Sequence, residues 1–196
     1  MRLIINFILI ALIALFGYLV VNSISEPIAF NTVREKRKDA VVERLGKIRD
    51  AQKLYRSITG EFAPSFDTLA QVLTEGRFTE VSVTGDPDDP QGNTEITYDT
   101  TFIAAKDSVY KVINMSVDSL QFVPYTNFSK KFVVTADTIT YQQTLVPVVQ
   151  VRTQYKDFMG KYADPAYSKY KSNYDPNSFI GFGDMNKPNL SGSWDR

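Results

Sequence analysis

The chain of 196 residues contains no cysteine and no histidine. Their absence excludes disulfide bonds, thiolate nucleophiles, imidazole bases and the commonest zinc ligands. The sequence also lacks a G-x-S-x-G elbow, a P-loop and a G-x-G-x-x-G turn. Nothing distinguishes a catalytic pair among the 22 acidic residues. We therefore expect a protein that is not an enzyme and has no organic cofactor, with a hydrolase built on two carboxylates as the remaining catalytic alternative.

An excess of charge of one sign is also absent, because 22 basic residues balance 22 acidic ones. Without a basic field to attract phosphates, nucleic acid is not an expected partner. Hydrophobic residues make up 43% of the chain, and charged residues make up 22%, which is typical of a folded protein. The length suffices for one domain with its own core and an anchor.

A long apolar run occupies residues 3–21, which are nineteen positions without a charge and with Asn6 as the one strongly polar member. At about 1.5 Å per residue a helix of this length spans roughly 28 Å, close to the hydrocarbon thickness of a bilayer. We expect residues 1–22 to form a transmembrane anchor. The alternatives are a cleaved signal peptide, whose apolar core is usually shorter, and a helix buried in a soluble core.

The orientation of this anchor depends on the basic residues that flank it. Arg2 precedes the run, and a basic cluster follows it: Arg34, Lys36, Arg37 and Lys38. Counted literally, the positive-inside rule places the soluble part in the cytoplasm. The cluster begins a dozen residues beyond the run, however, which weakens its effect on topology. We expect a single-pass protein of a bacterial inner membrane with a periplasmic domain.

The same membrane-proximal basic cluster is a candidate contact for anionic lipid or for an acidic partner. Glu35, Asp39 and Glu43 are interspersed with it or follow it at helical spacing. The alternative is therefore a solvated helical face on which these charges pair with one another.

Residues 23–59 are expected to form an amphipathic helix. Apolar residues recur there at steps of three or four, at Val41, Leu45, Ile48, Ala51, Leu54 and Ile58. Pro27 is expected to kink this helix or separate it from the anchor, and Gly60 to end it. A second, short helix at 66–75 is predicted by Ser65 as its N-cap and Gly76 as its stop.

Residues 60–159 are expected to form an α+β domain, because the apolar period changes after the second helix. Alternating or β-branched segments predict antiparallel strands around 96–102, 109–117, 131–135, 139–141 and 146–153. Pro147 is expected to place the last of these strands at an edge or to delay its start.

Residues 160–196 are rich in aromatics, proline and glycine and are expected to be mostly irregular. Asp164 and Pro165 predict a capped helical turn in this segment. Large aromatic side chains dominate many protein interfaces, which makes the segment a candidate partner-binding region. Its candidate residues are Tyr167, Tyr170, Tyr174, Phe179, Phe182 and Trp194. The alternative is that these rings pack across the sheet and complete the core.

The loop from Gly85 to Asn93 is a candidate calcium site. It gathers four oxygen ligands within nine residues, namely Asp86, Asp88, Asp89 and Asn93. Two prolines and the glycines of the same loop also suit an exposed turn, and the spacing departs from the D-x-D-x-D-G pattern. A solvated turn without metal is the alternative.

Residues 44–73, RLGKIRDAQKLYRSITGEFAPSFDTLAQVL, resemble the type IV pilins and the pseudopilins of type II secretion. In that family an apolar helix continues as an amphipathic helix, and a G-x-[FY] turn leads into a short helix. The resemblance implies an α+β, pilin-like fold in which the long helix packs on an antiparallel β-sheet. The sequence lacks the family's hydrophilic leader and the Glu near the start of its apolar helix.

These departures point to a structural or assembly subunit of a secretion or pilus-type envelope machine that is not a filament component. Its expected partners are the lipid bilayer and other envelope proteins, with self-assembly as a further possibility. The alternative function is a membrane-tethered adaptor that binds a partner protein through the aromatic C-terminal region.

Overall fold

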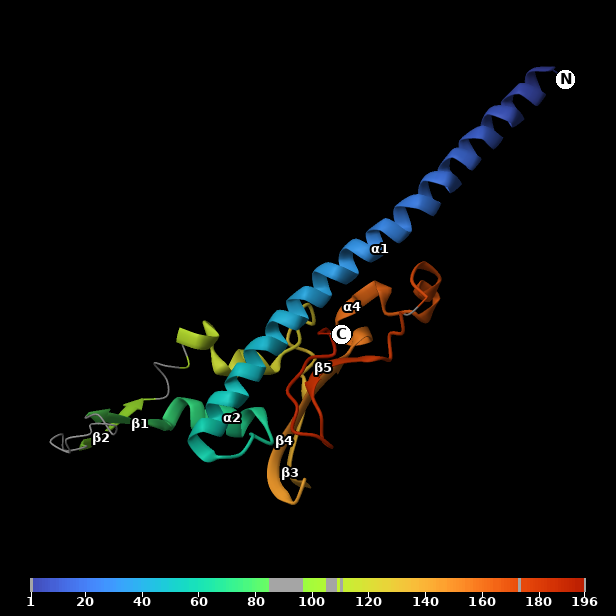
Figure 1. Ribbon diagram of the computed structural model, residues 1–196. Helices are drawn as coiled ribbons and strands as arrows, with labels where there is room; N and C mark the ends of the chain where they lie inside the picture. Colours follow the sequence, from blue (N-terminus) through green and yellow to red (C-terminus); the bar gives the residue numbers. More distant parts are fainter. Residues whose placement is uncertain (1, 85–96, 105–108, 110, 173, 196) are drawn as a thin grey trace.

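The computed structural model describes residues 2–84, 97–104, 109, 111–172 and 174–195. The fold is α+β, as expected, and it is organised around one long helix, α1 (Arg2–Thr59). The N-terminal half of α1 projects away from the folded domain, while its C-terminal half runs through it (Figure 1). One continuous helix thus joins two parts of very different character.

The helix continues through Pro27 without a break, so the predicted separation of anchor and amphipathic helix is wrong. Proline removes only one helical hydrogen bond, and nearby polar side chains bond to helix carbonyls. Asn31 Nδ2 donates to the carbonyl of Pro27 at 3.0 Å, and Ser25 Oγ donates to that of Val21 at 2.8 Å. These bonds add to the helix on both sides of the proline.

The predicted end of α1 and the predicted second helix are both confirmed. Gly60 has a φ of +84° and donates its N–H to the carbonyl one turn back at 2.8 Å. Helix α2 (Phe66–Glu75) begins after Ser65, whose Oγ accepts the N–H of Thr68 at 3.1 Å, and it ends at Gly76. Local capping chemistry is therefore sufficient to set these boundaries.

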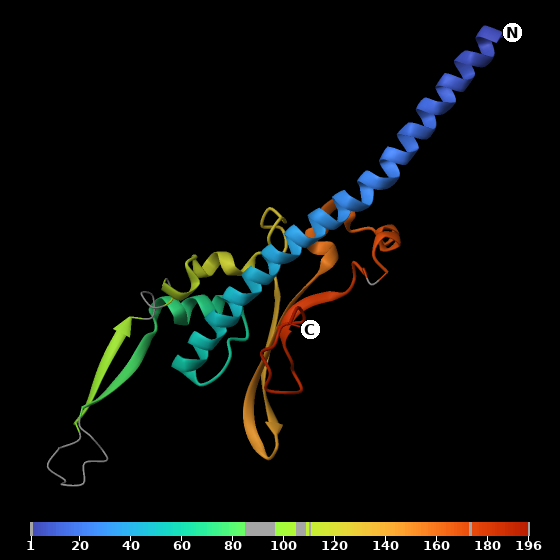
Figure 2. The same cartoon turned by 45° about the horizontal axis from the view of Figure 1, so that its top comes forward.

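The strands of the described residues form two separate antiparallel sheets. The first is a hairpin of β1 (Arg77–Thr84) and β2 (Thr97–Ala104), which points away from the rest of the domain (Figure 2). The second has the order β3-β4-β5, with β3 (Val133–Tyr141), β4 (Thr144–Gln154) and β5 (Phe179–Gly183). The short helical elements with described bounds are η1 (Val117–Gln121), α4 (Tyr155–Met159), η2 (Gly160–Tyr162) and η3 (Pro165–Tyr170).

The strand predicted at residues 109–117 is wrong. Residues 109 and 111–113 are helical, and Val117 begins η1. Val109 and Ile113, four positions apart, are both buried in the core. A helical turn places such a pair on one face, and that burial overrides the β-propensity of the β-branched residues.

Pro147 lies inside β4 opposite Thr138 of β3, and the strand begins three residues before it. A late start is therefore wrong. The edge prediction is partly right, because β5 pairs with β4 only over 150–154. At Pro147 the central strand has a partner on one side only, where a residue without an N–H is tolerated.

The segment 160–196 contains β5, which was not predicted. This strand has glycine at both 181 and 183, and glycine is a poor strand former. A Cβ built at Gly181 would lie 2.2 Å from the carbonyl oxygen of Val151, and one at Gly183 would lie 1.9 Å from that of Val149. Only residues without a side chain allow β5 to approach β4 so closely.

The core joins one stripe of α1 to α2, the sheet and the C-terminal segment. Fully buried members include Leu45 and Ile48 of α1, Leu69 of α2, Val151 of β4 and Phe182 of β5. The predicted apolar stripe of α1 is thus the contact face of the helix, although Leu54 and Ile58 remain partly exposed. The domain is folded around the C-terminal half of α1.

Candidate membrane anchor and interaction surfaces

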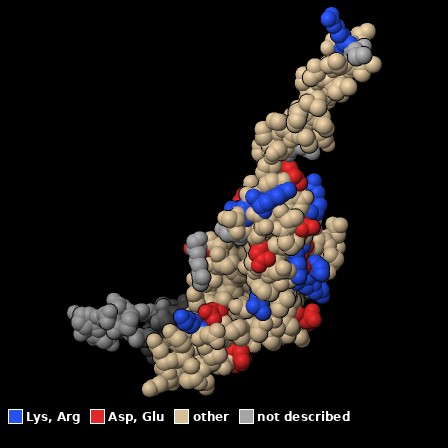
Figure 3. Space-filling model, turned by 90° about the vertical axis from the view of Figure 1, so that its right-hand side faces the viewer, with Lys and Arg blue, Asp and Glu red and all other residues tan. Residues whose placement is uncertain are grey.

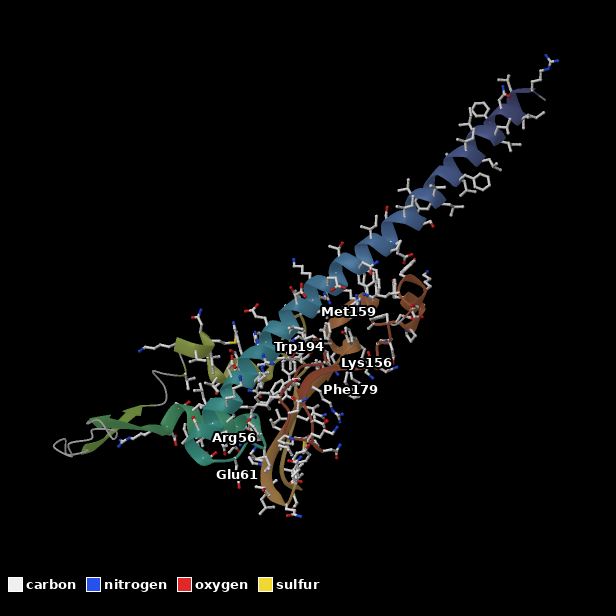
Figure 4. The ribbon with its side chains drawn as sticks, in the orientation of Figure 1. Arg56, Glu61, Lys156, Met159, Phe179 and Trp194 are labelled. Atoms are coloured by element: carbon white, nitrogen blue, oxygen red, sulfur yellow. The ribbon has the colours of Figure 1, made fainter. Side chains whose placement is uncertain are left out.

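Residues 2–21 of α1, which we call its apolar half, have no intramolecular partner outside the helix in the described part of the chain. All its large hydrophobic side chains from Leu3 to Val21 are exposed, with relative exposures from 46% at Leu12 to 74% at Leu3. Figure 3 shows this half as a rod without acidic or basic atoms except at its tip, and Figure 4 shows its side chains pointing outward on all sides. A helix that is apolar all round belongs in lipid or within a larger apolar assembly. This one is long and apolar enough to cross a membrane.

Where α1 enters the folded domain, Phe30 is fully buried among four tyrosines, which we call the tyrosine collar. The ring centroid of Phe30 lies 5.1 Å from that of Tyr174, 5.6 Å from those of Tyr162 and Tyr167, and 6.0 Å from that of Tyr170. Aromatic pairs at these distances contribute about 0.5–1.5 kcal/mol each beyond their buried area. The collar therefore fastens the C-terminal segment to α1.

Hydrogen bonds from the tyrosine hydroxyl groups fix this collar. Tyr174 Oη donates to the carbonyl of Tyr162 at 2.6 Å, and burial raises the pKa of Tyr174 to about 12. Tyr170 Oη donates to the carboxylate of Glu26, which raises the pKa of Tyr170 above its usual value. The ammonium of Lys169 lies 4.6 Å from the ring centroid of Tyr170. Helix α1 and η3 are thus joined at the point where the helix leaves the domain.

The aromatic residues predicted to bind a partner are mostly engaged within the fold. Tyr174 and Phe182 are buried, and Tyr167 and Tyr170 belong to the collar. Trp194 is half-buried, with its ring 6.0 Å from the guanidinium of Arg49. These contacts agree with the packing alternative for the five rings.

Phe179 differs from the other predicted rings because 48% of its surface is exposed. Its ring lies 4.5 Å from the guanidinium of Arg152, on the sheet away from the collar (Figure 4). Docking of a partner at this residue remains a prediction.

The basic cluster is divided by the fold. Arg34 is buried and pairs with Glu35, and Arg37 donates to the carbonyl of Phe158. Lys36 is exposed and Lys38 is half-buried. Arg34 lies about 20 Å beyond Val21 along the helix axis, whereas charges in 0.1 M salt are largely screened beyond about 10 Å. A direct contact of this cluster with headgroups is therefore not favoured, although it remains a candidate for an acidic protein partner.

Of the pairing expected within this cluster, the described residues show the ion pair of Arg34 with Glu35, and the other carboxylate contacts are made by lysines outside the cluster. Lys47 Nζ lies 2.9 Å from the carboxylate of Glu43 one turn earlier, and Lys171 from the C-terminal segment approaches Glu35 at 3.8 Å. Such exposed pairs contribute little stability.

A surface that the sequence did not reveal is the loop of residues 122–131, which we call the aromatic loop. Tyr125 and Phe128 are 49% and 72% exposed and have φ angles of +64° and +62°. Asn127 between them also has a positive φ, of +49°. Each such residue costs of order 1–3 kcal/mol unless its surroundings enforce it. No turn motif signals this loop, because aromatic residues rarely adopt that conformation.

Hydrogen bonds across the base of the aromatic loop enforce its shape. Val123 donates its N–H to the carbonyl of Lys130 at 2.9 Å, and Phe132 donates to that of Gln121 at 2.9 Å. The buried hydroxyl of Thr126 donates to the carbonyl of Val123 at 2.7 Å. The loop is therefore held in one conformation, with two aromatic rings exposed to solvent.

Two depressions accompany these surfaces. One of about 360 Å³ lies between the aromatic loop and α1, where Glu43, Arg44 and Lys47 line it. Another of about 390 Å³ lies between β4, β5 and the C-terminal residues near Asp195.

The candidate calcium ligands Asp86, Asp88, Asp89 and Asn93 lie outside the described residues. Within the described ranges no group of three or more acidic, histidine or cysteine side chains is placed to hold a metal ion. The calcium hypothesis therefore remains a prediction.

Comparison with known proteins gives no match, whether to a family model, to a curated protein or to a solved structure.

Proposed function

We propose that this chain is a non-enzymatic, pilin-like structural or assembly subunit of a bacterial envelope machine, of the secretion or pilus type. The apolar half of α1 would lie in the inner membrane, and the folded domain would lie in the periplasm. The observation that carries the proposal is the division of one continuous helix into an apolar half with all its large side chains exposed and a half that forms the spine of the domain.

The arrangement around that spine supports the pilin-like part of the proposal. The C-terminal half of α1 packs against α2 and a three-stranded antiparallel sheet, and the turn between the helices lies at Gly60. These are the elements that the resemblance over residues 44–73 implies. A fold that holds a domain at a fixed distance from a membrane suits contact between proteins more than chemistry on a small substrate.

The aromatic loop is the surface that we assign to contact with another envelope protein. Exposed aromatic rings on a rigid backbone lose little entropy on binding, which is why they are frequent at interface hot spots. The guanidinium of Arg37 lies 5.1 Å from the ring of Tyr125, and Lys130 and Lys131 follow Phe128 along the chain. A partner with acidic and apolar groups complements this surface.

The anchor is tested by fractionation of cells that express the full chain and two variants. A charged residue near the bilayer centre costs about 2.5–3.5 kcal/mol, so Leu9→Arg combined with Leu12→Arg should release the chain from membranes. Leu145→Arg is the matched control, because Leu145 is 71% exposed on the β3-β4 hairpin and should leave the chain membrane-bound. Protease added to spheroplasts should digest the domain of the wild-type chain. A wild-type chain found entirely in the soluble fraction would overturn the proposal.

Contact with a partner is tested by a photo-crosslinking residue placed in the full chain in cells. At Phe128 we expect a covalent adduct with an envelope protein, and at Glu61, an exposed control site remote from the loop, we expect none (Figure 4). A third site at Phe179 tests the adaptor alternative. Adducts at Phe179 without adducts at Phe128 would favour an adaptor that uses the C-terminal region.

A further inference from the structure

Among the described elements, η3 is the part of the folded domain that lies nearest the apolar half of α1 (Figures 1 and 2). It is held there by the hydrogen bond from Tyr170 to Glu26 and by the stacking of Tyr167 on Phe30 at 5.6 Å. Asp164 caps the start of η3 by accepting the N–H of Ala166 at 2.8 Å. The cap orders η3 itself, and its two tyrosines fix its position relative to α1.

The rise of the helix places η3 at a definite depth if residues 3–21 fill the hydrocarbon. Glu26 is five positions beyond Val21, which corresponds to about 7.5 Å along the axis. The polar layer on each side of a bilayer is about 5–8 Å thick. Ile24 and Ile28 are 58% and 61% exposed, so apolar surface continues through this layer. Glu26, and Tyr170 bonded to it, lie at the level of the headgroups.

The residues of η3 suit that layer chemically. Tyrosine has an apolar ring and a polar hydroxyl, and it concentrates at membrane interfaces for this reason. Tyr167 and Tyr170 are half-buried and Lys169 is exposed. Lys161 and Lys171 add positive charge nearby, but Glu26, Glu35 and Asp164 offset it. The location and aromatic character of η3, more than its net charge, favour contact with the headgroup layer.

From this placement we infer that η3 rests on the headgroup layer of the same bilayer that α1 crosses, as a second membrane contact of the folded domain. The inference rests on the proposed anchor. Two contacts fix the tilt and rotation of a domain, whereas one helix leaves rotation free. The aromatic loop would then face neighbouring envelope proteins in one orientation.

The test measures quenching of tryptophan fluorescence in the full chain reconstituted into vesicles. The quencher is either a nitroxide on the lipid headgroups or bromine at the middle of the lipid acyl chains. The wild-type chain supplies the aqueous control, because Trp194 is its only tryptophan. The Trp194 ring contacts Arg49, which lies about 42 Å beyond Val21 along α1 and therefore far from the bilayer. Ser168→Trp and Phe16→Trp, each combined with Trp194→Phe, report on η3 and on the anchor. Ser168 is exposed on η3 between Tyr167 and Lys169.

We expect headgroup nitroxide to quench the Ser168→Trp chain severalfold more than the wild-type chain, and mid-chain bromine to quench the Phe16→Trp chain most. If the Phe16→Trp chain is strongly quenched while the Ser168→Trp chain is quenched as little as the wild type, the second contact is overturned and the anchor is intact. Absence of quenching at both engineered sites would overturn the anchor itself, and the inference with it. Tyr170→Phe in the Ser168→Trp chain should reduce headgroup quenching, since it removes the bond to Glu26, whereas Tyr141→Phe should not.

Discussion

Gln52 of α1 and Ala63 are joined by two reciprocal hydrogen bonds. Gln52 Nε2 donates to the carbonyl of Ala63 at 3.1 Å, and the N–H of Ala63 donates to Gln52 Oε1 at 2.9 Å. Both residues are fully buried. The side-chain amide therefore satisfies the backbone of the chain that returns from Gly60 toward α2, as a neighbouring strand would. This buried polar pair holds the turn after α1 against the helix.

Gln52→Ala should destabilise the domain by roughly 2–4 kcal/mol, because it leaves the buried N–H and carbonyl of Ala63 without partners. Gln71→Ala is the control, since Gln71 is exposed on α2 and its loss should change little. The measurement is denaturant unfolding of the full chain in detergent, followed by circular dichroism. Equal unfolding midpoints for the two variants would show that the reciprocal bonds contribute nothing.

Phe30→Ala should cost about 3–5 kcal/mol, because it empties the centre of the tyrosine collar and leaves a cavity. Phe16→Ala removes the same atoms from the apolar half of α1, where the side chain of Phe16 is 57% exposed. This substitution should leave the unfolding of the domain unchanged. Thermal unfolding in detergent compares the two variants. If both lower the melting temperature to the same extent, the collar does not fasten the C-terminal segment to α1.

Two glycine substitutions should act in opposite directions. Gly183→Ala forces a Cβ to 1.9 Å from the carbonyl oxygen of Val149 at a φ of +84°, so β5 must move away from β4. We expect a loss of at least about 2 kcal/mol. Gly46→Ala meets nothing within 4 Å in the middle of α1 and should stabilise the helix by up to about 1 kcal/mol. A denaturation midpoint of Gly183→Ala equal to that of the wild type would contradict the close approach of β5.

The raised pKa of Tyr174 predicts a stability change at high pH. Burial raises this pKa from 10.0 to about 12, so the folded state holds the phenolic proton more tightly than the unfolded state does. The corresponding stability is fully present below pH 10 and is lost as the pH rises through 12. At pH 9, Tyr174→Phe should cost about 1 kcal/mol through the lost bond to Tyr162.

Between pH 10 and 12 the stability of the wild-type chain should fall toward that of Tyr174→Phe, because the variant has no proton to lose at this position. Tyr125→Phe is the control at an exposed tyrosine. Unfolding curves collected across this pH range give the comparison. A constant difference between wild type and Tyr174→Phe would be incompatible with the raised pKa.

Elements whose signals lie within a few consecutive residues were predicted well. Gly60 ends α1, Ser65 and Gly76 bound α2, and Asp164 caps η3, because each of these contacts is made between residues close in sequence. The aromatic loop and the turn between β3 and β4 were missed. That turn uses Gln142 and Gln143 at positive φ, where asparagine and glycine are the usual residues.

The sequence alone determined the apolar half of α1, its length relative to a bilayer, the amphipathic half that follows and the caps of the short helices, since these depend on side-chain type at local spacing. Only the tertiary structure decided that β5 pairs with β4, that the helix continues through Pro27, and that Tyr167, Tyr170 and Tyr174 surround Phe30. The rings that bury Phe30 lie more than a hundred positions away in the sequence, and the residues of β5 lie at least 25 positions from their partners in β4. No local pattern specifies such distant partners.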